Sequence, residues 1–240
     1  MTSKVNFQTI NRQGAAQSVA DQMMDLIFAK ELLPGHELPS EGDLAGLFGV
    51  GKSSVREALR SLEALGVVDI RHGKRAVVRQ PSSEAMAKMY KFLIFSSRSG
   101  LDDILEFRSI LETEAVVFAA QRRTEEQLKA IKDALDTFVE SLNGPQEVFI
   151  DNDMLFHISI AEAVGNIVLS YTLHAYREVI RESIQRLFIP LEQRSSEGLL
   201  KRHVNIYECI AAKDPAGAKE AMQVHFGASG ILQARNAMLS

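Results

Sequence analysis

The sequence has little cysteine and no long hydrophobic run. Its single cysteine, Cys209, excludes a disulfide within the chain and a cysteine-based zinc cluster. No run of about eighteen apolar residues is present, and the first residues, MTSKVNFQTINR, lack the hydrophobic segment of a signal peptide. We therefore expect a soluble protein that stays in the cytoplasm and has no membrane partner.

A strong net charge is also absent, because the 240 residues carry a net charge of only −4. The charge is unevenly distributed, with +1 on residues 1–80 and −5 on residues 81–240. Between Lys52 and Arg79 there are seven basic residues and three acidic ones. This concentration of positive charge is compatible with nucleic-acid binding, although charge alone does not distinguish it from a solvated surface of mixed charge.

One short segment, GLFGVGKS at residues 46–53, matches the P-loop pattern of nucleotide-binding proteins. A P-loop requires a buried strand before its first glycine. The preceding residues, LPSEGDLA, instead indicate the start of a helix, because Ser40 and Asp43 have the spacing of a capping box and apolar residues recur at helical spacing. The sequence therefore predicts a helix here and no ATP site.

The first 80 residues have the pattern of a winged helix-turn-helix domain. Three helices are predicted: the first ends at the Pro-Gly turn of LLPGHELP, the second runs from Ser40 to about Phe48, and the third ends at Gly66. The β-prone runs 67–70 and 76–78 flank a basic turn and predict a small β-hairpin wing. The residues expected to face the core are Val19, Met23, Leu26 and Ile27 in the first helix and Val55, Leu59, Leu62 and Leu65 in the third.

The rest of the chain is predicted to be an all-α bundle, so that the protein as a whole is mainly α. The stretch QPSSE, residues 80–84, is polar and contains proline, and we expect it to be a linker or a helix cap, with a hinge near Pro81 if the protein is a regulator. An apolar content of 46% is sufficient for a second packed core. The bundle is expected to have six to seven helices, within the segments 83–96, 101–121, 124–142, 146–164, 166–188, 196–213 and 215–238.

The segment LPGHELPSEGDLAGLFGVGKSSVREALRSLEALGVVDIRHGKRAVV closely resembles the DNA-binding domain of GntR-type bacterial transcription regulators. Its opening LPSE, central SVREAL and terminal LEALG occur together at the family spacing. The helical remainder resembles the effector domain of the FadR subfamily, called FCD. The resemblance implies a winged helix-turn-helix domain over residues 1–80 and an effector-binding and dimerisation domain over residues 81–240. It also implies a homodimer that represses transcription from a short palindromic operator in double-stranded DNA.

The expected DNA contacts lie on the recognition helix and the wing. An arginine near the start of a recognition helix can pair with guanine in the major groove, and we assign this role to Arg56. Lys52 is expected to bind a phosphate, whereas Arg60 either contacts DNA or pairs with Glu57 or Glu63. The resemblance adds phosphate and base contacts by Lys52, Ser53 and Ser54, and minor-groove contacts by the wing-tip residues His72 and Gly73.

Three positions depart from the pattern of the GntR-type regulators. Gly42 stands where arginine or lysine is common, Gly51 replaces a common serine or threonine, and Lys52 replaces a common arginine. Each departure removes or weakens a DNA contact that the resemblance would otherwise imply. We therefore expect an operator sequence or affinity that differs from those of similar regulators.

Four residues of the helical region form a candidate metal site. Asp153 and His157 are four residues apart and therefore project from one face of a helix, while His203 and His225 occur in register with apolar positions. Three imidazoles and a carboxylate suit Zn²⁺, with Ni²⁺ or Mn²⁺ as alternatives, and leave open positions on an octahedral ion. By spacing alone, each histidine taken singly is better explained as an ordinary core residue.

The resemblance to FCD domains adds to this site. The pattern D…FH followed by H…I…I…D…A…M…H is that of the metal-binding members, and all four positions match here. The resemblance also implies that Arg108 points into the same cavity and binds the effector, a small carboxylate such as a hydroxy acid or a sugar acid. Two other arginines, Arg177 and Arg181, are expected to form surface salt bridges.

Two alternative functions are compatible with the same residues. A metal-dependent hydrolase could use the His/Asp site to activate water, but no further carboxylate or histidine is evident as a general base, and the winged helix would be unexplained. A DNA-binding protein that responds to no ligand is the second alternative. We therefore expect a ligand-controlled transcription regulator that is not an enzyme.

Overall fold

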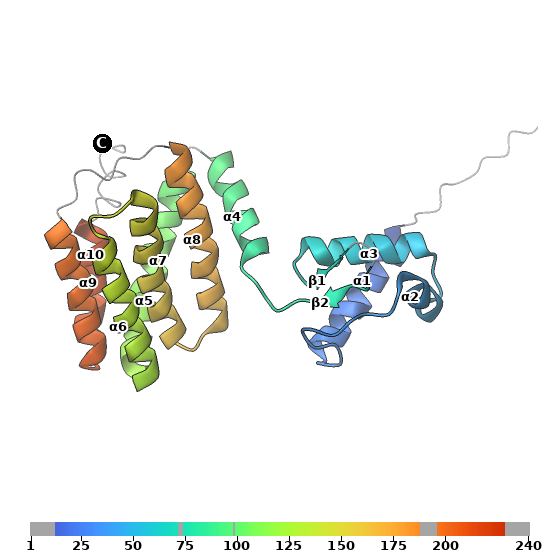
Figure 1. Ribbon diagram of the computed structural model, residues 1–240, viewed down its shortest axis with the longest axis horizontal. Coiled ribbons are helices and arrows are strands. Elements are labelled where there is room, and N and C mark those ends of the chain that lie inside the picture. The colour runs from blue at the N-terminus through green and yellow to red at the C-terminus, as the bar shows by residue number, and fades with distance from the viewer. Residues whose placement is uncertain (1–12, 72–73, 98, 188–195, 229–240) are drawn as a thin grey trace, which may run out of the picture. The chain divides into compact units, whose positions relative to one another are not determined.

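The computed structural model describes residues 13–71, 74–97, 99–187 and 196–228. Over these ranges the chain consists of helices and one small β-sheet (Figure 1). It divides into two compact units, Met1–Ala85 and Met86–Ser240. Each unit has a hydrophobic core of its own, and we describe them separately.

The first unit is built on three helices: α1 (Gln13–Phe28), α2 (Glu41–Phe48) and α3 (Lys52–Ala64). The capping box that the sequence predicts is present, since the Ser40 side chain accepts from the backbone N–H of Asp43 and the Asp43 side chain accepts from that of Ser40. Helix α2 ends at Gly49, whose φ of 64° lies in the left-handed region. The helix therefore occupies the position where a P-loop would need a strand.

The wing contains strands β1 (Val68–Asp69) and β2 (Val77–Val78), which pair antiparallel with Val68 opposite Val78. A third segment joins them, because Glu37 forms an antiparallel bridge with Val77 and the Leu38 N–H donates to the Ala76 carbonyl at 2.7 Å. The sequence LLPGHELP predicts only a turn, because its proline and glycine are unfavourable in a strand and the pairing is a single bridge at Glu37. The wing tip, His72 and Gly73, lies outside the described residues.

The core of the first unit confirms most of the expected inward-facing residues. Val19, Met23, Val55, Leu59 and Leu62 are all buried. Leu65 is an exception, because 61% of its surface is exposed. Leu65 is the C-cap residue of α3, which stops at Ala64, and Gly66, with a φ of 75°, turns the chain directly after it, so the apolar stripe of the helix does not continue through Leu65.

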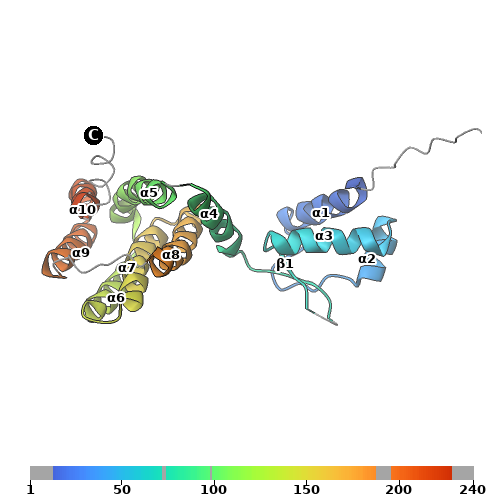
Figure 2. The same cartoon turned by 90° about the horizontal axis from the view of Figure 1, so that it is seen from above.

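The second unit is a bundle of helices that begins with α4, whose first two residues precede the boundary between the units. Figure 2 shows these helices close to end-on, with α9 and α10 side by side and α6 next to α7. Each predicted segment contains a helix, while residue 188 and residues 229–238 of the predicted segments lie outside the described residues. The bounds are α4 (Glu84–Ser96), α5 (Gly100–Arg122), α6 (Glu125–Ser141), α7 (Gln146–Ala163), α8 (Ile167–Leu187), α9 (Ser196–Ala211) and α10 (Pro215–Ala228).

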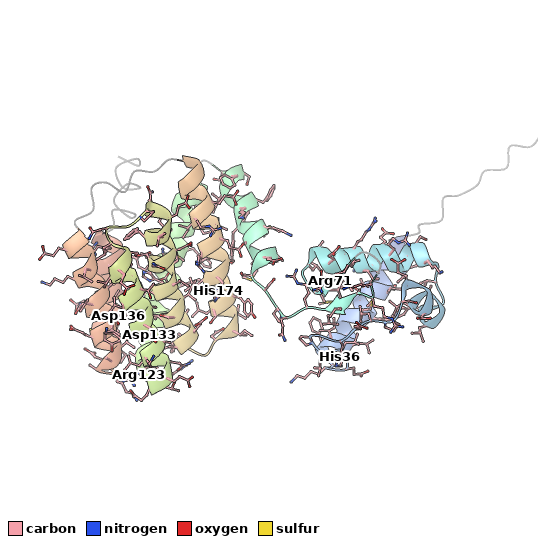
Figure 3. All side chains as sticks on the ribbon, in the orientation of Figure 1. His36, Arg71, Arg123, Asp133, Asp136 and His174 are labelled. Atoms are coloured by element: carbon pink, nitrogen blue, oxygen red, sulfur yellow. The ribbon has the colours of Figure 1, made fainter. Side chains whose placement is uncertain are left out.

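Packing of the bundle follows the apolar stripes of the helices. Helix α6 presents Ile131, Leu135 and Phe138 to the core, while its outer face carries Asp133 and Asp136, each paired with a lysine four residues earlier (Figure 3). The buried positions of α9 are Leu199, His203, Ile206 and Ile210. This spacing of three and four residues places a histidine in the middle of an apolar stripe.

The end of α5 is tied to the end of α9 by the buried side chain of Arg123, which donates to the Ala211 carbonyl at 2.8 Å. Figure 3 labels this arginine. The contact satisfies a carbonyl at the helix C-terminus, which would otherwise lack an intrahelical partner. Across the residues that the structure describes, no helix is both long enough and apolar enough to cross a membrane.

Replacement of the buried Ile131 by alanine tests the packing of the bundle. Ile131 is fully buried in α6, so Ile131→Ala should lower the free energy of unfolding by about 2–5 kcal/mol through lost burial and a residual cavity. All four tyrosines lie beyond residue 85, so tyrosine fluorescence during urea denaturation follows the bundle. Val148→Ala, at a side chain that is 47% exposed, is the matched control and should change stability by less than about 0.5 kcal/mol. Equal losses in both variants would contradict this packing.

Candidate metal centre and DNA-binding surface

Helices α7, α9 and α10 bring together Asp153, His157, His203 and His225, the four residues predicted from the sequence. Each offers a ligand atom, and these atoms all lie within 4.8 Å of one another. The three imidazoles are buried and the carboxylate is partly exposed. The arrangement is compact enough for one ion to contact all four groups.

The imidazoles pack against one another in the interior of the bundle, edge-on for His203 with each of the others and tilted for His157 with His225. Their ring centroids are 5.6 Å apart for His157 and His203, 4.9 Å for His157 and His225, and 4.7 Å for His203 and His225. On its other side the His203 ring stacks on Phe138, with centroids 4.1 Å apart and an interplanar angle of 24°. Aromatic packing therefore fixes the orientation of at least one ligand ring.

The contacts of His203 suit a bound cation. Its Nδ1 lies 3.0 Å from the Leu199 carbonyl oxygen, and its Nε2 lies 3.1 Å from Oδ1 of Asp153. Both partners are acceptors, whereas a neutral imidazole has only one N–H. One contact therefore requires either a second proton on the ring or a metal ion held between the nitrogen and the carboxylate.

Two further nitrogens point to the same conclusion. His157 Nε2 and His225 Nδ1 are buried and have no hydrogen-bond partner among the described residues. An unsatisfied buried polar atom costs about 1–3 kcal/mol. Coordination of a metal ion would supply the missing partner, so the residues fit such an ion.

The charge states of the cluster also suit a metal. Burial raises the pKa of Asp153, but the contact with His203 and the neighbouring cationic groups lower it by more, so the net shift is strongly downward. Burial is the main cause of a lowered pKa at His225. The carboxylate is therefore ionised and the His225 imidazole neutral, which are the forms that bind metals.

Arg108 lies beside this cluster, as the resemblance implies. It is buried on α5, and its Nη2 is 3.7 Å from Oδ2 of Asp153. Within the described part of the chain, this Nη2 makes no hydrogen bond. Burial lowers the pKa of Arg108, but Glu112 and Asp153 raise it by more, so the guanidinium stays charged.

Glu112 is part of the site and was missed by sequence analysis. Its Oε1 accepts a hydrogen bond from Nε of Arg108, and its Oε2 contacts Nδ1 of His157. Burial raises the pKa of Glu112, yet Arg108 and His157 lower it below its ordinary value. A signal was available, because Glu112 falls on the apolar stripe of α5 that continues through Val116 and Ala119.

The remaining charged residues of this region form pairs. Arg177 and Arg181 both contact Asp151, at 3.2 and 3.6 Å, in the salt bridges that the sequence predicts. His174 is labelled in Figure 3 on α8 and lies 3.2 Å from Glu162. These residues are partly exposed and take no part in the buried cluster.

The expected DNA-contacting residues Lys52, Ser53, Ser54, Arg56 and Arg60 all lie on α3. Arg56 is held by Glu41 at the start of α2, with hydrogen bonds of 3.1 Å from Nε and 2.6 Å from Nη2. Arg60 is exposed, and in the described residues it pairs with neither Glu57 nor Glu63. Glu63 instead accepts from the backbone N–H of Ile70 at 3.1 Å.

Two of the departures from the family pattern, Gly42 and Lys52, lie close together. A Cβ added at Gly42 would lie 3.4 Å from Cε and 3.5 Å from Nζ of Lys52. The Lys52 side chain therefore passes directly over the space that a larger residue at position 42 would occupy. Within unit 1, Gly42 and Lys52 form one surface with Glu41 and Arg56.

Comparison with protein families and known proteins agrees with this architecture. Residues 15–78 match the family "Bacterial regulatory proteins, gntR family", and residues 103–228 match the "FCD domain". The chain is 30% identical over 217 residues to the HTH-type transcriptional repressor NanR of Klebsiella aerogenes, which covers 89% of this chain and 83% of that protein. It is 29% identical over 198 residues to the HTH-type transcriptional regulator LutR of Bacillus subtilis, with 81% and 90% covered.

Among solved structures, the Streptococcus agalactiae GntR protein has the same fold. Its TM-score is 0.65 at 23% sequence identity, with 89% of this chain and 98% of that chain covered. Both relatives are described as transcriptional regulators and neither as an enzyme, which favours the regulator over the hydrolase alternative. The chain thus belongs to the GntR family of bacterial transcription regulators, as a member whose DNA-binding domain is followed by an FCD effector domain.

Proposed function

We propose that this GntR-family regulator is a homodimeric repressor whose operator affinity is lowered by a small carboxylate bound beside a metal ion in the FCD domain. The buried His/Asp cluster, with His203 facing two acceptors, is the observation that carries this proposal. Repression is supported by relatives that are named transcriptional repressors. The proposal assigns DNA binding to residues 1–80, and effector binding and dimerisation to residues 81–240. It places the protein in the cytoplasm.

Asp153, His157, His203 and His225 would hold the ion, with Zn²⁺ as the first expectation and Ni²⁺ or Mn²⁺ as alternatives. When bound, the ion supplies a Lewis-acidic position that accepts an oxygen of the effector. The protein groups do the rest of the recognition. Arg108 is charged and buried, and its Nη2 lacks a hydrogen-bond partner among the described residues, so it can bind the other oxygen of a carboxylate.

The site identifies the effector only by its chemical class. A buried guanidinium next to a metal centre suits a small organic acid such as a hydroxy acid or a sugar acid. To change DNA affinity, this acid must bind the DNA-competent and DNA-incompetent arrangements with different affinity. We propose that the linker near Pro81 is the hinge between them.

The repressor mechanism is tested by measuring operator affinity with and without a panel of hydroxy acids and sugar acids. The operator is first obtained by selection from random DNA with the purified protein. We expect one acid to weaken binding of metal-loaded protein and to have no effect after chelation. An equal response in loaded and chelated protein would refute the metal's part in effector binding.

The DNA-contacting residues are expected to divide into two kinds. Arg56→Ala should abolish the preference for the selected operator, because Arg56 is the residue that we assign to guanine. Lys52→Ala should weaken binding to all sequences and reduce the slope of log affinity against log salt by about one. Fluorescence anisotropy at several salt concentrations measures both effects.

Arg122→Ala, at an exposed arginine of the FCD domain, is the matched control and should bind as the unaltered protein does. A retained sequence preference in Arg56→Ala would remove Arg56 from base recognition. An unchanged salt slope in Lys52→Ala would remove Lys52 from phosphate binding.

The metal site is tested by two histidine variants. The purified protein is expected to contain one divalent ion per chain and to lose thermal stability on chelation, because an ion that binds the folded state stabilises it. His157→Ala should lose the ion, whereas His174→Ala, at the partly exposed histidine beside Glu162, should keep it. Elemental analysis and thermal melting give the answer, and unchanged metal content in His157→Ala would count against the site.

We assign the dimer contact to the second unit, where α4 and α5 carry exposed apolar side chains. Met89, Phe92 and Leu93 on α4 are 59%, 68% and 52% exposed, and Ile110 on α5 is 58% exposed. Such a density of exposed apolar residues is typical of a surface that another chain covers. A two-fold dimer would match the two half-sites of a palindromic operator.

The expected result of Phe92→Glu is a monomer in analytical ultracentrifugation, because a charge would be buried in the contact. Ile167→Glu, at a side chain of α8 that is 65% exposed, is the control and should remain dimeric. A dimeric Phe92→Glu protein would place the contact elsewhere, and a monomeric unaltered protein would refute the homodimer.

A further inference from the structure

Glu112 makes two contacts at once inside the bundle. One oxygen accepts from Nε of Arg108 on its own helix, and the other contacts Nδ1 of His157 on α7. Only 2% of its side chain is exposed. The hydrogen bond from Arg108 uses only one of the two oxygens of Glu112. It does not explain why the other oxygen lies against His157.

The contact with His157 determines which ring nitrogen can bind a metal. A carboxylate only accepts hydrogen bonds, so the His157 nitrogen that faces Glu112, Nδ1, must carry the proton. The neutral ring then has its lone pair on Nε2, a buried atom that has no hydrogen-bond partner in the described chain and, unlike Nδ1, no contact with Glu112. Metal-binding histidines commonly donate their second N–H to a carboxylate, which fixes the ring and raises the basicity of the ligand nitrogen.

The same contact adjusts the charge of the site. Glu112, Asp153 and Arg108 together carry one negative charge, since Arg108 cancels one of the two carboxylates. A divalent ion would turn this into one positive charge, which a single carboxylate ligand neutralises. Without Glu112 the loaded site would carry two positive charges in a buried environment, where excess charge is costly.

We propose that Glu112 is a positioning residue of the metal centre, which holds His157 with Nδ1 protonated and Nε2 directed to the ion, while Arg108 keeps Glu112 in place. This inference rests on the proposed metal site. It assigns a role to a residue that is not itself a ligand and that lies on a different helix from all four ligands.

The test compares Zn²⁺ affinity in the full-length protein by competition with a chromophoric chelator. Glu112→Ala should bind Zn²⁺ about 10–100-fold more weakly, the loss typical of removing such a partner. Glu112→Gln keeps an oxygen that can accept from His157 but lacks the charge, so it should recover part of this loss. Glu114→Gln is the matched control, because Glu114 lies on the same helix and pairs with Lys219 at the surface.

A second measurement separates positioning from a general effect on stability. Long-range ¹H–¹⁵N correlation spectra of metal-free protein report which nitrogen of each histidine carries the proton. The His157 signals, assigned by their loss in His157→Gln, should show the Nδ1–H form in the unaltered protein and in Glu112→Gln. Glu112→Ala should gain the Nε2–H form, and Glu114→Gln should not.

The outcomes distinguish this inference from the proposed function. If the unaltered protein binds no Zn²⁺, the metal site and the role of Glu112 both fail. If it binds Zn²⁺ and every Glu112 variant that folds binds it equally well, only the role of Glu112 fails. Should Glu112→Ala not fold, the comparison of Glu112→Gln with Glu114→Gln decides by the same criterion.

Discussion

Three imidazoles and one carboxylate lie between α7, α9 and α10, in an interior where each unsatisfied polar atom costs about 1–3 kcal/mol. Such groups are tolerated only if every nitrogen and oxygen finds a partner. The structure provides some of these partners itself, through the Leu199 carbonyl, Asp153 and Glu112. The ring nitrogens that have no protein partner surround a position that suits a cation. The packing of α7, α9 and α10 brings them together there.

The supporting groups extend this constraint through the FCD domain. Phe138 on α6 stacks on His203, and Arg108 and Glu112 on α5 connect to Asp153 and His157 on α7. Five of the packed helices, α5, α6, α7, α9 and α10, therefore contribute either a candidate ligand or a group that contacts one. An effector that enters beside Arg108 would act on charges already balanced within this network, which is a physical route from a small acid to a change in helix packing.

In the DNA-binding domain the equivalent constraint is the pair formed by Glu41 and Arg56. The carboxylate at the start of α2 binds two nitrogens of the arginine on α3, which holds the guanidinium in one orientation at the surface. A bidentate pair of this kind has little freedom, so less entropy is lost when the arginine contacts a base. A side chain at position 42 would touch Lys52 at ordinary van der Waals distance, so two of the positions where this chain departs from similar regulators are neighbours.

Local sequence patterns determined most of the secondary structure. The capping box at Ser40, the glycine at the end of α2 and the apolar stripes of the bundle act over three or four residues, and the helices begin and end close to where these signals occur. The bridge at Glu37 could not be predicted from local patterns, because its partner, Val77, lies forty residues further along the chain. The exposed Leu65 was misplaced because the helical period continued past the point where the helix ends.

The sequence by itself also supplied the four candidate ligands, since their residue types and register could be seen along each helix. Only the tertiary structure could decide that side chains from α7, α9 and α10 converge on one point, and that Glu112 on α5 contacts one of them, His157. Convergence depends on how helices pack, which no single helix encodes. Likewise, the pairing of Arg56 with Glu41 joins two helices across a turn and arises from their packing rather than from any local pattern.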